Sequence, residues 1–273
     1  PPPPPPPPPF FFNHHAGTRD SVASRGLGDV YKRQVQRIDK TNAKFELGYW
    51  AIRGLGQPIR FLLAHAEAAF SEIRFGVNQD GSIVEEESQD WATHKDTLSL
   101  PFPNLPYLID SSGPNEVRMT QSNAIMRYLA RRFDYYGDTA SDLICIDVLQ
   151  DEAYDFRNAI ISTAYTLGTE YEAVFDEFTS ITVPRYLDGF ANYLSNRGIS
   201  THFVGSRISL VDFILYELIW QISMMVPGSI TDTSRPSLQK FINTFEKIPQ
   251  IVAYMASSDF IDRPINSIWA SFM

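Results

Sequence analysis

The chain has 273 residues, of which 44% are hydrophobic, so it is long enough for one large domain or two ordinary ones with a substantial core. Its net charge is −9, but residues 1–44 carry +4 and residues 45–273 carry −13, so the acidic part has no net attraction to nucleic acid or to an anionic membrane. No apolar run is long enough to span a membrane, because Glu217 interrupts the longest one, around Phe213 to Val226.

Residues 1–44 differ in composition from the rest of the chain. Nine prolines are followed by three phenylalanines, two histidines and a stretch rich in Gly, Ser and Arg, with no apolar periodicity. We expect this segment to be either translated sequencing-adapter read-through, which Ser21 to Gln34 resembles, or a disordered extension. We assign it no fold and no chemistry.

Residues 45–63 predict a strand, a turn and a helix. Apolar and aromatic residues indicate a strand that ends near Trp50, two glycines supply the turn, and Pro58 suits the first turn of a helix. Tyr49 therefore lies at the C-terminal end of a strand and beside a helix start, where ligands bind in open α/β sheets. From these residues alone, Tyr49 and Trp50 are equally well ordinary strand aromatics.

The segment that follows completes an α/β domain. The expected elements are a strand at residues 71–77, a polar loop from Asn78 to Asp90, a helical turn at residues 91–95, a strand ending at Asp110, a hairpin turn at residues 110–115, a return strand at residues 117–119, and a helix starting at residues 120–123. The order β-α-β, then β-β-α, is that of a thioredoxin-like domain, which we place at residues 45–133.

This topology brings together the turn after Tyr49, the loop before Pro106, and the helix start at Gln121 and Ser122. Pro106 directly precedes a strand, a position that suits a cis bond in a tight turn. A helix start offers free backbone amides and a favourable dipole for a carboxylate. The alternative is that Ser122 only caps the helix, which is the commoner role of such a serine.

Residues 134–141 predict a linker, and residues 142–273 predict an all-helical domain. A long helix is expected from Leu143 to Leu167, with Ile144, Val148, Phe156, Ile160 and Leu167 in its buried stripe and with Asp151, Asp155, Asn158, Ser162 and Tyr165 on one polar face. A capping box at residues 209–212 predicts a core helix that ends near Met225. Further helices are expected at residues 237–247 and 249–257.

Three motifs closely resemble those of cytosolic glutathione transferases, the mu class in particular. They are Leu47 to Trp50, Phe102 to Asp110 and Thr120 to Tyr128, in the family's order and with near-family spacing. The resemblance covers roughly residues 45–273. It implies the glutathione transferase fold, a thioredoxin-like α/β domain followed by an all-α domain, with glutathione as cosubstrate and with no metal or other cofactor.

The resemblance also implies roles for individual residues. Tyr49 matches the tyrosine whose hydroxyl donates a hydrogen bond to the glutathione sulfur; because a free thiol has a pKa near ~8.5 and only the thiolate is a good nucleophile, such a bond favours the reactive form. Glutathione contacts are implied at Trp50, Trp91, Lys95, Asn104, Leu105, Pro106, Gln121 and Ser122, and at Asp155 from the neighbouring subunit. Ile52, Leu55, Asn158 and Tyr165 match the electrophile pocket, and Phe102 and Arg127 match a homodimer interface.

Some residues depart from the mu pattern or admit a second interpretation. Ala51 stands where mu enzymes usually carry Asp, and Ser88 stands where they often carry Arg. The loop from Asn78 to Asp90 is a few residues longer than the usual mu loop. Phe102 is either an aromatic that inserts into the partner subunit or a local core residue.

Two functions follow from the resemblance. One is conjugation of the glutathione thiolate to small hydrophobic electrophiles, as in detoxification, and the other is a non-catalytic ligand-binding or structural role like that of lens crystallins of this family. The intact binding residues favour the enzyme. The single cysteine, Cys145, does not lie at the first helix start, which disfavours a glutaredoxin-like role, and it favours a reducing, cytoplasmic compartment.

Overall fold

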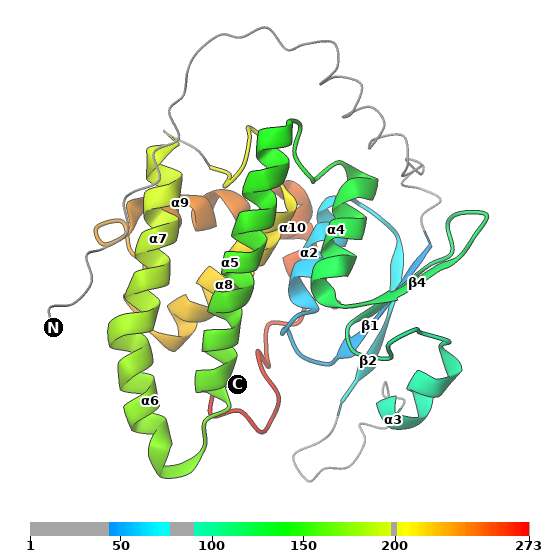
Figure 1. Cartoon of the computed structure of the whole chain (residues 1–273), viewed down its shortest axis with the longest axis horizontal. Helices are drawn as coiled ribbons and strands as arrows, with labels where there is room; N and C mark the ends of the chain where they lie inside the picture. The colour runs from blue at the N-terminus through cyan, green and yellow to red at the C-terminus, as the bar shows by residue number, and fades with distance from the viewer. Residues whose placement is uncertain (1–43, 77–89, 198–200, 273) are drawn as a thin grey trace, which may run out of the picture. The chain divides into compact units, whose positions relative to one another are not determined.

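The computed structural model describes residues 44–76, 90–197 and 201–272, all of which belong to one unit of the chain (Figure 1). The head expected at residues 1–44 lies outside the described residues except for Lys44. The same holds for the loop expected from Asn78 to Asp90, except for Asp90. Within the described ranges no helix is both long and apolar enough to cross a membrane.

Four strands form one mixed sheet in the order β2-β1-β3-β4. β1 pairs parallel with β2 and antiparallel with β3, and β3 pairs antiparallel with β4. Parallel neighbours need a crossover connection, which α2 provides. This confirms the expected thioredoxin-like order. The bounds are β1 Phe45–Trp50, α2 Gln57–His65, β2 Phe70–Phe75, β3 Tyr107–Asp110, β4 Val117–Thr120 and α4 Ser122–Phe133.

The two faces of the sheet belong to different hydrophobic clusters. Side chains alternate along β3, so Leu108 joins the main core with α2 and α4, whereas Tyr107 and Ile109 join a second cluster. The second cluster is covered by Trp91 of α3 (Trp91–His94), which is followed by the 3-10 turn η2 (Lys95–Thr97). Only glycine fits at position 48 of β1 in this packing, because a Cβ there would lie 1.9 Å from the Tyr107 ring.

The remainder of the chain is helical, as expected. Its helices are α5 Ala140–Ala164, α6 Tyr171–Glu177, α7 Val183–Asn196, α8 Leu210–Met225, α9 Pro236–Phe245 and α10 Pro249–Met255, with a 3-10 turn at Gly168–Glu170 and a π-helical segment at Phe178–Thr182. The expected capping box is present: Ser209 and Asp212 cap α8 reciprocally. α8 packs against α5, α2 and α9, so it is the core helix of this part.

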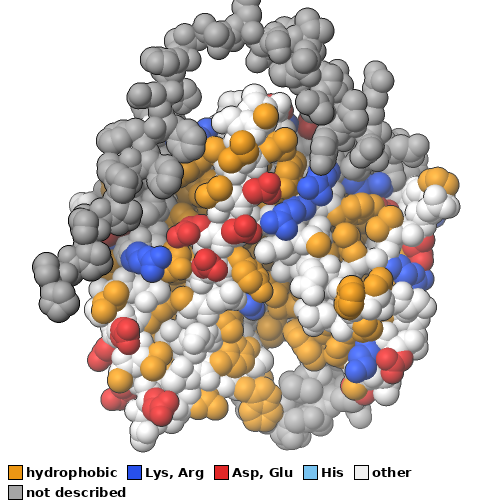
Figure 2. All heavy atoms as spheres, in the orientation of Figure 1, with side chains coloured by type: hydrophobic (Ala, Val, Ile, Leu, Met, Phe, Trp, Pro, Cys, Tyr) orange, Lys and Arg blue, Asp and Glu red, His pale blue; other side chains and the backbone are white. Residues whose placement is uncertain are grey.

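The expected buried stripe of α5 is wrong in part. Ile144, Val148 and Leu167 are each 63% exposed, whereas Phe156 and Ile160 are fully buried. The buried side of the helix is completed by Ile146, Leu149 and Ala153. Apolar residues occur on two sides of α5, and packing against α8 decides which side is buried. Figure 2 shows hydrophobic and acidic side chains together on the surface over α5.

Candidate functional site

Tyr49 ends β1 with its side chain almost completely buried. The backbone N–H of Leu55 donates a hydrogen bond to the Tyr49 hydroxyl oxygen at 2.9 Å. The phenol's own proton therefore stays available for donation to a further acceptor. Burial raises the pKa of Tyr49 above its ordinary value, although the Leu55 hydrogen bond and the charge of Arg157 act against this increase. At neutral pH this residue is a protonated hydrogen-bond donor.

Two glycines let the turn after β1 close around the Tyr49 ring. A Cβ at Gly54 would lie 2.6 Å from the Tyr49 hydroxyl, and a Cβ at Gly56 would lie 2.6 Å from its Cδ1. Gly54 also has a φ of +37°, which disfavours any side chain. The N–H of Gly54 in turn donates to the carbonyl of Ile265 at 3.1 Å, which ties the turn to the C-terminal tail.

A buried ion pair fixes the same turn to α8. The Arg53 guanidinium donates to both carboxylate oxygens of Glu217, at 2.9 and 2.7 Å, and to the Ile261 carbonyl at 2.9 Å. Both side chains are 1% exposed, and the guanidinium carbon lies 3.9 Å from the centre of the Trp220 ring. Burial acts against the charge of Arg53, but Glu217 raises the pKa of this guanidinium above its usual range.

The loop before Pro106 and the start of α4 meet the turn after Tyr49, as the topology predicts. The Leu105–Pro106 peptide bond is cis, which confirms the expected tight turn. In this loop the N–H of Leu105 donates to Asn104 Oδ1 at 2.9 Å. Gln121 immediately precedes α4 with a φ of +72°, a strained conformation for a residue with a side chain. Such strain concentrates at binding and catalytic sites.

Ser122 is the first residue of α4 and does not cap it. The N-cap position belongs to Gln121, whose side chain makes no capping hydrogen bond. The alternative that Ser122 serves only as the N-cap is therefore wrong. The backbone amides of this first turn point to the N-terminal end of the helix, where the dipole favours an anion.

A cavity of about 260 Å³ lies where these segments meet. It is lined by Leu55, Asn104, Leu105, Pro106, Gln121, Ser122, Asn123, Tyr154 and Arg157. Six of these nine residues are among those that the sequence assigns to the site. The structure thus brings residues of two motifs together with Leu55 of the turn after Tyr49, across 67 positions between Leu55 and Ser122.

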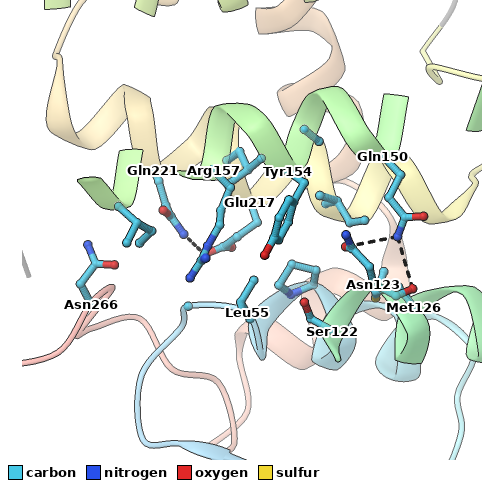
Figure 3. Close-up of a pocket in the computed structure, with 16 residues that line it drawn as sticks. Leu55, Ser122, Asn123, Met126, Gln150, Tyr154, Arg157, Glu217, Gln221 and Asn266 are labelled. Atoms are coloured by element: carbon cyan, nitrogen blue, oxygen red, sulfur yellow. Dashed lines mark hydrogen bonds between the residues drawn. The ribbon is translucent and has the colours of Figure 1, made fainter. Parts of the chain in front are cut away.

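A smaller cavity of about 40 Å³ shares Leu55, Ser122, Tyr154 and Arg157 with the first (Figure 3). Its other walls are largely apolar and include Met126, Ile161, Ile214 and Leu218, together with polar Gln150, Glu217, Gln221 and Asn266. Asn266 belongs to the C-terminal tail, so the tail forms part of this wall.

Other predicted site residues line neither cavity. Trp91 stacks on Tyr107 with ring centres 6.2 Å apart, and Lys95 follows it in η2. Tyr165 accepts a hydrogen bond from the Ser267 N–H at 3.0 Å. Trp50, Ile52, Asp155 and Asn158 also line neither cavity. The assignments of all these residues stay predictions.

Tyr154 and Arg157 are pocket residues that sequence reasoning missed. The sequence interpretation placed the functional face of α5 on the stripe through Asp155 and Asn158, which is exposed. The cavities are lined instead by the neighbouring face, which carries Tyr154, Arg157 and Ile161 at helical spacings of three and four. That spacing was the available signal, but it does not by itself say which face meets α2 and α4.

The two predicted interface residues differ in their surroundings. Phe102 is 75% exposed, so the alternative that it is a local core phenylalanine is wrong. Arg127 of α4 lies 3.8 Å from the carboxylate of Asp147 and 3.5 Å from that of Asp151, both on α5. Their place in a dimer stays a prediction.

Comparison with known proteins finds similarity along most of the chain. The family described as "Glutathione S-transferase, N-terminal domain" matches residues 45–131, and "Glutathione S-transferase, C-terminal domain" matches residues 154–258. Glutathione S-transferase Mu 1 of Oryctolagus cuniculus is 36% identical over 80% of this chain and 94% of its own length. Glutathione S-transferase Y1 of Cricetulus longicaudatus is 34% identical over 83% and 97%. Among solved structures, the sigma class enzyme of Fasciola hepatica has a TM-score of 0.66 and 28% identity, over 78% of this chain and 96% of that one.

Proposed function

Since this chain belongs to the glutathione S-transferase family, we propose that it conjugates the thiolate of reduced glutathione to small hydrophobic electrophiles. The observation that carries the proposal is the Tyr49 phenol, which is protonated and accepts from the N–H of Leu55. Tyr49 itself lines neither cavity, but Leu55 lines the one formed by the cis-Pro106 loop and the start of α4. The comparisons give no support to the non-catalytic alternative.

Tyr49 acts on the sulfur of glutathione as a hydrogen-bond donor. A hydrogen bond to the charged form of a thiol lowers its pKa, so more of the bound glutathione is thiolate at neutral pH. The Leu55 N–H strengthens this effect, because a donor to the phenol oxygen polarises the O–H bond. The thiol proton is released as the thiolate forms. The thiolate then attacks the electrophilic carbon to form a C–S bond, and in a substitution such as that of 1-chloro-2,4-dinitrobenzene the C–Cl bond breaks and chloride leaves with its electron pair.

The cysteinyl and γ-glutamyl parts of glutathione contact residues of the larger cavity. The backbone of Leu105, held by cis-Pro106, pairs with the cysteinyl residue as an added strand does, with Asn104 beside it. The first turn of α4, at Gln121 and Ser122, takes the γ-glutamyl carboxylate. Trp50, Trp91 and Lys95, which line neither cavity, hold the glycyl end, because an indole N–H and an ammonium are suitable donors for its carboxylate.

The active form is a cytoplasmic homodimer. Phe102 is largely exposed although it is a large aromatic residue, which supports its insertion into a partner subunit. Asp155 is exposed on α5 and reaches the amino group of glutathione in the neighbouring site. A chain with Cys145 as its single cysteine suits a reducing compartment.

The experiment is glutathione conjugation to 1-chloro-2,4-dinitrobenzene by the full chain and its Tyr49→Phe variant. The variant keeps the ring and loses only the donor, so kcat/KM falls by about 10- to 100-fold, since a hydrogen bond to a charged group contributes roughly 1.5–3 kcal/mol. The pH at half-maximal rate moves upward, because the bound thiol regains a higher pKa.

Tyr186→Phe is the matched control, since Tyr186 lies on α7 and stacks on Phe156, 4.5 Å between ring centres. It removes a phenol outside the cavities and keeps the parent rate. Equal rates for the parent and Tyr49→Phe contradict the role of Tyr49. A parent chain that binds a glutathione column but conjugates no electrophile contradicts the transferase proposal and leaves the ligand-binding alternative.

A further inference from the structure

Arg157 extends from α5 into both cavities. Figure 3 shows it reaching, together with Tyr154, toward Leu55 and Ser122 on the opposite wall. Its charge is close enough to Tyr49 to lower the pKa of the phenol. Under the proposed function, the guanidinium therefore stands near the sulfur and the incoming electrophile.

Among the described residues, Arg157 forms no ion pair with a carboxylate. Its one hydrogen bond, from Nη1 to Asn158 Oδ1, is long at 3.5 Å. Glu217 lines the same cavity, but its two oxygens already accept from Arg53, and one of them also accepts from Gln221. Because the Glu217 carboxylate is already paired with Arg53, it does not neutralise the charge of Arg157.

Two of the three arginines of the neighbouring helix α4 lie close to carboxylates, whereas the third, Arg131, lies over the Tyr136 ring. Arg132 lies 3.1 Å from the carboxylate of Asp110, and Arg127 lies within 4 Å of two carboxylates of α5. A half-buried guanidinium without a carboxylate loses part of its hydration and gains little in return. It is therefore available to an anionic group that enters the cavity.

The surroundings of Arg157 define the rest of such a ligand. Leu55, Ile161 and Leu218 line the same cavity, and most of its wall is apolar. Because this cavity holds only about 40 Å³, a ligand with an aromatic ring also occupies the adjoining cavity of about 260 Å³, which Arg157 lines as well. Such a ligand has an apolar body and a negative group at one end. A carboxylate suits this arrangement because it accepts two parallel hydrogen bonds from a guanidinium.

We propose that Arg157 makes this enzyme selective for hydrophobic electrophiles that carry a carboxylate, which it binds while the reactive carbon faces the glutathione sulfur. This inference rests on the proposed function. Glutathione itself also carries carboxylates, but the first turn of α4 and the pair Trp91 and Lys95 are available for them. The charge of Arg157 acts on Tyr49, which places it near the sulfur. Arg157 also shares both cavities with Ser122, so the test must separate binding of the acceptor from binding of glutathione.

The test compares two acceptors with the same reacting ring, 4-chloro-3,5-dinitrobenzoate and its methyl ester. The ester activates the ring more strongly than the carboxylate, and this intrinsic difference cancels when the same ratio is compared between the parent and its variants. In both reactions the thiolate forms a C–S bond to the ring carbon, the C–Cl bond breaks, and chloride leaves with the electron pair. The readout is the ratio of kcat/KM for the acid to kcat/KM for the ester, measured for the full chain, for Arg157→Met and for Arg157→Lys.

We expect the parent to prefer the acid and Arg157→Met to lose about tenfold or more of that preference, since hydrogen bonds to charged groups are typically worth that much. Arg157→Lys keeps part of it, because the charge remains and the planar fork is lost. Arg185→Met is the control: it removes the same charge from an exposed position on α7 and leaves the ratio unchanged.

Three outcomes overturn the inference. An acid-to-ester ratio that is the same in the parent and in Arg157→Met shows that Arg157 does not recognise the acceptor. A rise in the KM for glutathione that is equal with both acceptors shows that Arg157 holds glutathione instead. If the parent conjugates neither these acceptors nor 1-chloro-2,4-dinitrobenzene, the proposed function fails; if it conjugates only the latter, the proposed function stands. In both cases calorimetric binding of 3,5-dinitrobenzoate against its methyl ester decides the inference, and equal affinities refute it.

Discussion

The buried pair of Arg53 and Glu217 connects the Tyr49 turn with α8, and removing its negative member tests that connection. In Glu217→Gln the guanidinium stays in a position that is fully buried, with its charge unbalanced. The variant loses charge-assisted hydrogen bonds at 2.9 and 2.7 Å and retains those to the Ile261 carbonyl and one neutral amide oxygen.

Breaking one partner of a buried ion pair costs roughly 3–5 kcal/mol. Because Arg53 keeps the Ile261 carbonyl and its contact with the Trp220 ring, we expect the lower end, about 3 kcal/mol. For a chain of this length a urea slope of about 3 kcal/mol per molar is reasonable, so the unfolding midpoint falls by about 1 M. The measurement is equilibrium urea unfolding followed by circular dichroism.

Two further variants make the reasoning refutable. The double variant Arg53→Met with Glu217→Leu removes both charges and is expected to be more stable than Glu217→Gln, because no unpaired charge is buried. Glu116→Gln removes one member of an exposed pair with Arg118, 2.7 Å apart, and leaves the midpoint unchanged. A Glu217→Gln midpoint equal to that of the parent, or a double variant no more stable than the single one, would refute the account.

Two other predictions concern packing and pH. Gly48→Ala places a methyl group 1.9 Å from a carbon of the Tyr107 ring, so overpacking lowers stability by about 1–3 kcal/mol or more; an unchanged thermal midpoint would contradict this. Burial raises the pKa of Tyr254 to about 12 and raises the pKa of Tyr107 and Tyr216 further, whereas unfolded tyrosines ionise near about 10. The folded state thus keeps protons that the unfolded state releases, so stability is complete below about pH 10 and falls as the pH rises above it. Urea midpoints at pH 8.5 and 11 measure this, and equal values would show that these phenols ionise alike in both states.

Much of the candidate site could be predicted because its parts are local in sequence. The cis bond before Pro106 follows from a proline directly before a strand, and the turn after Tyr49 follows from two glycines and a proline. The helix start at Ser122 follows from a polar run before an apolar one. Each of these signals acts over a few residues, so it does not depend on how the rest of the chain packs.

Other features could not be predicted, because they depend on contacts between distant segments. Arg53 and Glu217 are 164 residues apart, and neither belongs to a local pattern that indicates a partner. The buried side of α5 was assigned incorrectly at Ile144 and Val148, since both sides of that helix carry apolar residues and only its contact with α8 selects one.

The sequence by itself determined the order of strands and helices, several caps and turns, and six of the nine residues that line the larger cavity. Tertiary structure alone decided that α5 presents Tyr154 and Arg157 to the cavities and that Glu217 balances Arg53, while Arg157 has no carboxylate partner in the described part of the chain. The physical reason is the distance along the chain over which each kind of interaction acts. Backbone preferences act between neighbours in the chain, whereas burial and charge pairing are set by whichever segments meet in space.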